Sequence, residues 1–149
     1  MDAKVPIIMI KERTSFTIGE EAILTKIISD DDIKAFARIS GDHNPEHMNE
    51  EYAKGTIFGG RIAHGMLVTS LISAVLGTSL PGPGAIYLSQ QLRFLAPVRP
   101  GDEVTARAKV TGWDPEKGRV TLSTEVANKK GIAVIAGEAH LVMSSYLKR

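Results

Sequence analysis

The chain has 149 residues, a length that suits one domain built around a single hydrophobic core. Apolar residues make up 43% of it and charged residues 23%, as in ordinary globular proteins. A net charge of +1 gives no electrostatic reason to expect nucleic acid or an acidic membrane surface as a partner. The lack of cysteine excludes disulfides, thiolate catalysis and zinc–thiolate sites.

The first residues carry a short apolar stretch, from Val5 to Ile10, that Pro6 interrupts. It is too short to span a bilayer and has no small-residue cleavage pattern, and no later run reaches the roughly 18 apolar residues of a membrane helix. We therefore expect a soluble cytoplasmic protein. We also expect one domain over residues 1–149, in which residues 1–14 form a loosely held N-terminal arm.

The first regular elements are predicted between residues 21 and 54. Residues Glu21 to Ile28 alternate well enough for a strand. Ser29 and the three aspartates after it predict the start of a helix, because their side chains accept hydrogen bonds from free N–H groups and suit the helix dipole. Gly41 ends this helix. Residues 41–47 combine glycine, asparagine and proline and are expected to be irregular, and a helical turn is expected over Glu50 to Lys54.

The second half of the chain predicts one long helix and four strands. From His64 the sequence reads GMLVTSLISAVLGTSL, which places apolar side chains on nearly every face of a helix over residues 65–77 and predicts burial all round. The β-rich segments that follow are Ile86–Leu95, Glu103–Thr111, Arg119–Asn128 and Ile132–Met143. This order predicts an α+β domain with one antiparallel sheet packed around a central helix.

The densest cluster of reactive groups is the loop Asp42-His43-Asn44-Pro45-Glu46-His47. A carboxylate and an imidazole on one rigid loop suit acid–base chemistry, in which one group accepts a proton and the other donates one. Two alternatives remain open: these are common loop residues whose spacing arises by chance, or Asp42, His43 and His47 bind a metal ion. The metal site is the weaker alternative, because Pro45 separates the two histidines.

A second feature is the glycine at the start of the long helix. The first N–H groups of a helix have no partner within it, and Gly65 would let a ligand approach them closely. Such N–H groups can stabilise an oxygen that becomes negative during a reaction. Alternatively, Gly65 only permits tight packing of the helix against a strand.

These residues resemble the MaoC-like dehydratase family, and within it the (R)-specific enoyl-CoA hydratases. The resemblance is carried mainly by Phe36-Ala-Arg-Ile-Ser-Gly-Asp-His-Asn-Pro-Glu-His47 and Arg61-Ile-Ala-His-Gly-Met66, and it extends over about residues 15 to 144. It implies a hot-dog fold, in which an antiparallel sheet wraps around a central helix. It also implies a homodimer or higher homo-oligomer, an acyl thioester substrate, and no bound cofactor or metal.

The resemblance assigns roles to five residues. Asp42 and His47 match the catalytic dyad that activates a water molecule, and Asn44 matches an asparagine that orients the dyad or the water. Gly65 matches the residue whose N–H holds the thioester carbonyl oxygen. Ser73 matches a serine near the acid–base pair, although it could equally be a small residue that permits close packing.

The expected activity is that of a hydro-lyase, reversible hydration of a trans-2-enoyl-CoA to the (R)-3-hydroxyacyl-CoA. The alternatives are a 3-hydroxyacyl-[acyl-carrier-protein] dehydratase, an enzyme for a branched dicarboxyl-type thioester, a thioesterase, and a non-catalytic acyl-thioester-binding subunit. The acyl pocket is expected between the central helix and the loop from Gly55 to Ala63. Arg61, Arg93 and Lys148 could meet the phosphates of coenzyme A, but solvated surface charge is the favoured interpretation of each.

Overall fold

The computed structural model describes residues 10–147, in which five strands form one antiparallel sheet in the order β1-β3-β4-β5-β2. The strands are β1 (Glu21–Ile27), β2 (Ala85–Phe94), β3 (Glu103–Asp114), β4 (Arg119–Asn128) and β5 (Ala133–Met143). Strands β3, β4 and β5 follow one another as hairpins, whereas β1 and β2 come from earlier in the chain and form the two edges. All five predicted strands are confirmed, with ends that differ by at most three residues.

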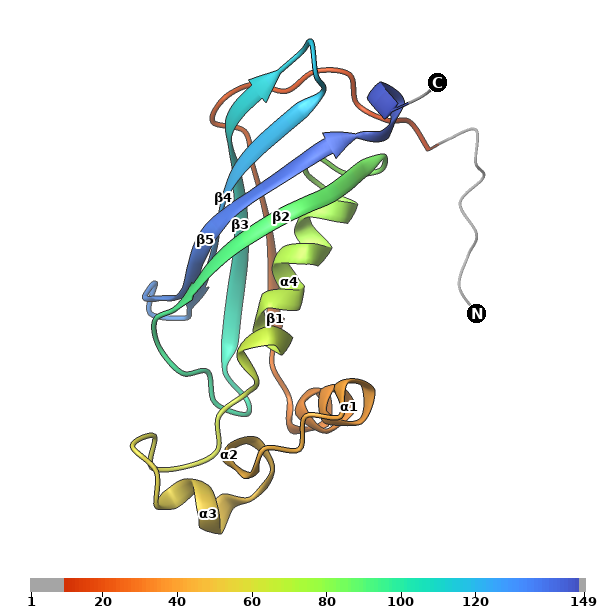
Figure 1. Ribbon diagram of the computed structural model, residues 1–149. Helices are drawn as coiled ribbons and strands as arrows, with labels where there is room; N and C mark the ends of the chain where they lie inside the picture. The colour runs from red at the N-terminus through yellow and green to blue at the C-terminus, as the bar shows by residue number, and fades with distance from the viewer. Residues whose placement is uncertain (1–9, 148–149) are drawn as a thin grey trace.

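The helices are α1 (Asp30–Ser40), α2 (Pro45–Met48), α3 (Glu50–Lys54) and α4 (Gly65–Thr78), and a short 3-10 helix, η2 (Ser144–Leu147), follows β5. Figure 1 shows α4 lying along one face of the curved sheet, with α1, α2 and α3 gathered at the end where α4 begins. This is the α+β arrangement that the sequence predicts. No helix within residues 10–147 is long and apolar enough to cross a membrane.

Helix α1 begins and ends where its sequence predicts. The Ser29 hydroxyl accepts a hydrogen bond from the Asp32 N–H, and the Asp32 carboxylate accepts one from the Ser29 N–H, both at 3.0 Å. Such reciprocal capping satisfies two free donors, and the cap serine alone is worth about 1 kcal/mol. At the other end Gly41 has a φ of 79°, a left-handed conformation that glycine adopts without strain.

The loop predicted over residues 41–47 contains a short helix, so that part of the prediction is wrong. Pro45 is the first residue of α2, where its missing N–H costs nothing and its fixed φ suits the helix. The Asn44 side chain caps this helix by accepting a hydrogen bond from the Glu46 N–H at 3.1 Å. The same residues that looked irregular therefore start a helical turn that carries His47.

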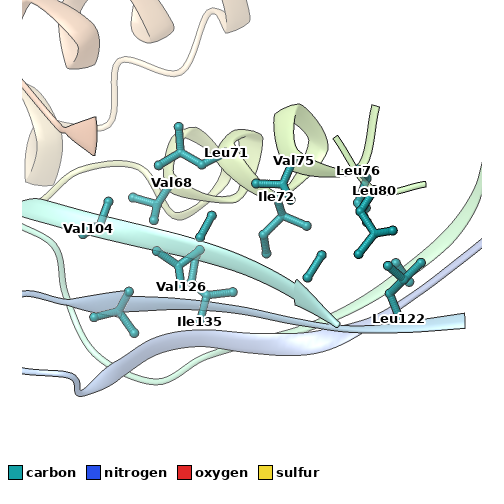
Figure 2. Close-up of a cluster of buried hydrophobic side chains, with 14 of the residues drawn as sticks. Val68, Leu71, Ile72, Val75, Leu76, Leu80, Val104, Leu122, Val126 and Ile135 are labelled. Atoms are coloured by element: carbon teal, nitrogen blue, oxygen red, sulfur yellow. The ribbon is translucent and has the colours of Figure 1, made fainter. Parts of the chain in front are cut away.

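The core lies between α4 and the inner face of the sheet. Figure 2 shows side chains from α4 facing those of the strands, and the labelled residues are Val68, Leu71, Ile72, Val75, Leu76, Leu80, Val104, Leu122, Val126 and Ile135. Along β3, buried Val104, Ala106, Ala108 and Val110 alternate with more exposed residues, as in a strand with one face on a core. Each fully buried large apolar side chain contributes about 1.5–3 kcal/mol to folding.

Helix α4 is not buried all round, contrary to the prediction. Its apolar residues gather on the side that faces the sheet, while the opposite side is exposed and consists largely of small residues with one methionine: Met66, Ser70, Ser73, Ala74 and Gly77. Small residues such as alanine, glycine and serine are compatible with both solvent and a protein core. The prediction treated them as core residues and therefore overestimated the burial of the helix.

The predicted N-terminal arm is only partly described. Residues 1–9 lie outside the described part of the chain, so for them the arm stays a prediction. From Ile10 on the backbone is described, and the Glu12 carboxylate accepts hydrogen bonds from Ser144 and Ser145 of η2.

Candidate functional site

The segment that carries Asp42 and His47 lies against the start of α4. The His64 Nε2–H donates a hydrogen bond to the backbone carbonyl oxygen of Asp42 at 2.9 Å. The rings of His47 and His64 are stacked, with their centroids 4.0 Å apart and an angle of 33° between their planes. The two motifs singled out in the sequence are therefore brought together in space.

His47 is buried, with 8% of its surface exposed, and its ring orientation is set by the backbone. Its Nδ1 lies 2.8 Å from the carbonyl oxygen of Ile62, an acceptor, so the proton of the neutral ring sits on Nδ1. The Nε2 atom then carries a lone pair that meets no hydrogen-bond donor among residues 10–147. The ring is thus prepared to accept a proton at Nε2.

Arg61 holds the backbone of His47 in place. Its Nε–H donates to the His47 carbonyl oxygen at 2.6 Å, and its Nη2 pairs with the Asp30 carboxylate at 2.6 Å. Only 17% of the Arg61 side chain is exposed, so its interpretation as a solvated surface charge is wrong. Arg93 is exposed on β2, and Lys148 lies outside the described residues.

Asp42 is exposed to solvent, and Asn44 organises the turn that follows it. One Asp42 carboxylate oxygen accepts a hydrogen bond from the Asn44 N–H at 3.1 Å. Because the Asn44 side chain also caps α2, this residue connects the carboxylate of Asp42 to the helix that holds His47. The role of Asn44 in orienting the dyad or the water stays a prediction.

His64 itself was not among the residues predicted from sequence. It is 2% exposed, packed between His47 and the ring of Phe36, whose centroid is 4.8 Å away. Burial lowers the pKa of its imidazole below the usual value, nearby His47 and His43 lower it further, and the hydrogen bond to Asp42 partly opposes this. The neutral ring donates through Nε2, and its buried Nδ1 has no hydrogen-bond partner among the described residues.

The possible metal ligands among the described residues are Asp42, His47 and His64, with His64 in the place where the sequence suggested His43. One carboxylate oxygen and one nitrogen of each ring lie within 4.8 Å of one another. Two groups that hydrogen-bond one water at about 2.8 Å each stand about 4.6 Å apart, so Asp42 and His47 lie close enough together to share a water.

An apolar cavity of about 280 Å³ opens beside this cluster, with His47 and Gly65 in its wall. Its other sides are formed by the loop from Phe58 to Ala63 and by residues 94–98, where the acyl pocket is predicted. A Cβ atom on Gly65 would lie 2.5 Å from the Phe94 ring. Glycine therefore permits close packing of α4 against Phe94 of β2, as the alternative interpretation of Gly65 states, and it also places the start of α4 in the wall of the cavity.

Ser73 is not brought into this cavity. It lies two turns further along α4, on the exposed side of the helix, and lines a separate hollow with Met66, Ser70 and residues 87–90 of β2. Neither His47 nor Gly65 lines that hollow. A role for Ser73 beside the acid–base pair stays a prediction.

Comparisons with known proteins agree with this fold. A relative from Rhodospirillum rubrum named (R)-specific enoyl-CoA hydratase is 56% identical over 125 residues, which cover 84% of this chain and 86% of the relative. The solved structure of an (R)-hydratase from A. caviae involved in PHA biosynthesis matches with a TM-score of 0.83 and 42% identity, over 87% of this chain and 98% of that one. A mitochondrial 3-hydroxyacyl-[acyl-carrier-protein] dehydratase from Arabidopsis thaliana is 34% identical over 90% of this chain and 81% of its own length.

The similarity to the A. caviae structure confirms the predicted hot-dog fold. The family model described as the MaoC like domain matches residues 14–132, which include the acid–base segment, α4 and four of the five strands in full. The chain belongs to the MaoC-like dehydratase family.

Proposed function

We propose that this protein is an (R)-specific enoyl-CoA hydratase, which adds water reversibly to a trans-2-enoyl-CoA to form the (R)-3-hydroxyacyl-CoA. The observation that carries the proposal is that His47 and Gly65 line one apolar cavity while Asp42 lies within 4.8 Å of His47. An acid–base pair and free helix N–H groups beside an apolar cavity are what the hydration of an enoyl thioester requires. The (R) configuration rests on the hydratase relatives alone.

In the proposed reaction the thioester carbonyl oxygen accepts a hydrogen bond from the Gly65 N–H. Conjugation makes C3 of the enoyl group electrophilic, and a water held between Asp42 and His47 attacks it. The water oxygen bonds to C3 while the Nε2 atom of His47, whose lone pair is free, takes the water's proton. The negative charge that develops on the thioester oxygen is held by the N–H, and C2 then takes a proton from the Asp42–His47 pair.

The second candidate is dehydration of a 3-hydroxyacyl group on acyl carrier protein, because one relative carries that name at 34% identity. Coenzyme A is favoured over the carrier protein, because the relative named for an enoyl-CoA substrate is 56% identical. Comparing kcat/KM for crotonyl-CoA with that for the crotonyl carrier protein separates the two. A preference of more than tenfold for the carrier protein would replace the first proposal with the second.

We further propose a homodimer formed along the β2 edge. Ile86, Tyr87 and Leu88 are 39–46% exposed on this edge strand, beside the exposed side of α4 with its Met66. An unpaired edge with exposed apolar residues is a site at which another chain can add to a sheet. Analytical ultracentrifugation tests the dimer, and a monomer at micromolar concentration would contradict it. The cytoplasmic location of the protein stays a prediction.

The proposed activity is tested by following the loss of enoyl absorbance with crotonyl-CoA, for the wild type and for Asp42→Asn. We expect hydration by the wild type and a loss of about 10²–10⁴-fold in kcat/KM for the variant, because an amide cannot exchange the proton. His43→Asn is the matched control, since His43 lies exposed on the same segment, and it should stay within threefold of the wild type. Near-normal turnover by a folded Asp42→Asn protein would remove Asp42 from the mechanism.

A further inference from the structure

We propose that His64 is a positioning residue that holds the segment with Asp42 and His47 against the start of α4, and so sets the distance between the acid–base pair and the Gly65 N–H. The inference rests on the proposed function, because only a reaction that uses both groups at once needs this distance to be fixed. It concerns a residue to which the resemblance assigns no role and which does not line the cavity.

The contacts of His64 reach both parts of the site. Its backbone is the N-terminal cap of α4, directly before Gly65. Its side chain donates from Nε2 to the Asp42 carbonyl oxygen at 2.9 Å and stacks on the His47 ring at 4.0 Å. One residue thus contacts both members of the pair through its side chain and joins the proposed oxyanion donor through its backbone.

A buried histidine at position 64 is less favourable for folding than an apolar side chain of similar size would be. The Nδ1 atom of His64 is buried without a partner among residues 10–147, and an unsatisfied buried acceptor is unfavourable. A leucine or phenylalanine would fill the same space without this cost, but neither could donate to the Asp42 carbonyl. The hydrogen bond from Nε2 is therefore the property that distinguishes histidine at this position.

The proton that makes this hydrogen bond is kept in place by the surroundings. The charged and titratable groups that face His64 are His47, Asp42 and His43. Burial disfavours the charged ring, so the neutral ring has one proton, and the Asp42 carbonyl oxygen holds that proton on Nε2.

His64 is assigned as a positioning residue and not a catalytic one because it does not line the cavity that His47 and Gly65 share. Its loss should therefore lower kcat through misplacement of Asp42 and leave the binding of substrate largely unchanged. A displacement of about 1 Å in a reacting group can cost about 10²-fold in rate. We expect a fall in kcat of between tenfold and 10²-fold, with KM within threefold of the wild type.

The test compares two substitutions that separate the ring from the hydrogen bond. His64→Phe keeps an aromatic ring against His47 but has no donor, whereas His64→Gln has an amide N–H near the place of Nε2. We expect the phenylalanine variant to show the full loss in kcat and the glutamine variant to recover at least fivefold of it. If the phenylalanine variant does not fold, His64→Asn replaces it, because its amide is too short to reach the Asp42 carbonyl.

Phe36→Leu is the matched control, since Phe36 packs on the same imidazole without a hydrogen bond to the segment, and its kcat should stay within threefold of the wild type. A second measurement does not depend on activity: hydrogen exchange of the Asn44 N–H, which donates to the Asp42 carboxylate. We expect this exchange to be at least fivefold faster in His64→Phe than in the wild type or His64→Gln.

The outcomes distinguish this inference from the proposed function. A wild type without hydratase activity would contradict the proposed function, and the exchange of the Asn44 N–H would still report whether His64 holds the segment. A folded His64→Phe protein with wild-type kcat and unchanged exchange would overturn the inference while leaving the hydratase activity intact. A glutamine variant as impaired as the phenylalanine variant would also overturn it.

Discussion

The N–H of Gly65 can be removed by a single substitution that the backbone should accept. Gly65 is the first residue of α4, a position at which proline is tolerated because the N–H has no partner within the helix. The preceding residue, His64, has φ −58° and ψ 132°, which is the extended conformation that proline requires before it. Gly65→Pro should therefore fold and lack the proposed donor to the thioester oxygen.

The size of the effect follows from comparison with Gly65→Ala. Both variants place a Cβ where the structure has 2.5 Å to the Phe94 ring, so in both the ring must move by about 1 Å to reach normal contact. Phe94 is 56% exposed and can move, so we expect each variant to change the free energy of unfolding by less than about 1 kcal/mol. Because only proline removes the donor, its kcat/KM should fall a further 10²–10³-fold below that of alanine, which is about 2.7–4 kcal/mol.

The assay is hydration of crotonyl-CoA at low substrate concentration, with urea unfolding of each variant. Gly55→Ala is the control for the glycine-to-alanine change, because Gly55 has a φ of −83° and an added Cβ would make only ordinary contact. Equal kcat/KM for the folded proline and alanine variants would refute the assignment of the N–H as the oxyanion donor. A loss of stability above about 2 kcal/mol in both would favour the alternative that Gly65 is needed for packing.

Two further predictions concern the support of the site. Arg61→Met should lower the free energy of unfolding by about 1–3 kcal/mol, because it leaves a half-buried His47 carbonyl without its donor. Urea unfolding measures this change. Arg107→Met is the control: it breaks an exposed ion pair and should lower the free energy of unfolding by less than about 1 kcal/mol. Burial lowers the pKa of His64, so the unfolded chain binds its proton at a higher pH than the folded protein does, and stability should fall as the pH drops below about 6.5. The Tm of the wild type should therefore fall more between pH 7.5 and pH 5.5 than that of His64→Gln, and parallel falls would show that His64 does not titrate in this way.

Much of the fold was determined by local sequence. Ser29 with Asp32 and Gly41 mark both ends of α1 because helix caps depend on the hydrogen bonds and dihedral angles of a few adjacent residues. The strands were predicted for a similar reason, since alternation along a strand reflects one buried face. The same kind of local information predicted the segment from Asp42 to His47 and the glycine at the start of α4 as the chemical centre.

Tertiary structure decided which residues meet and which sides are covered. His64 lies 22 positions after Asp42, and nothing in the sequence indicates that its ring stacks on His47 and donates to the Asp42 carbonyl. In the same way, the exposed side of α4, which carries Ser73, could not be recognised because small residues are compatible with both solvent and a core. Caps and alternation are short-range properties that a sequence states directly, whereas these contacts exist only because packing α4 on the sheet brings its first residue to the segment after α1.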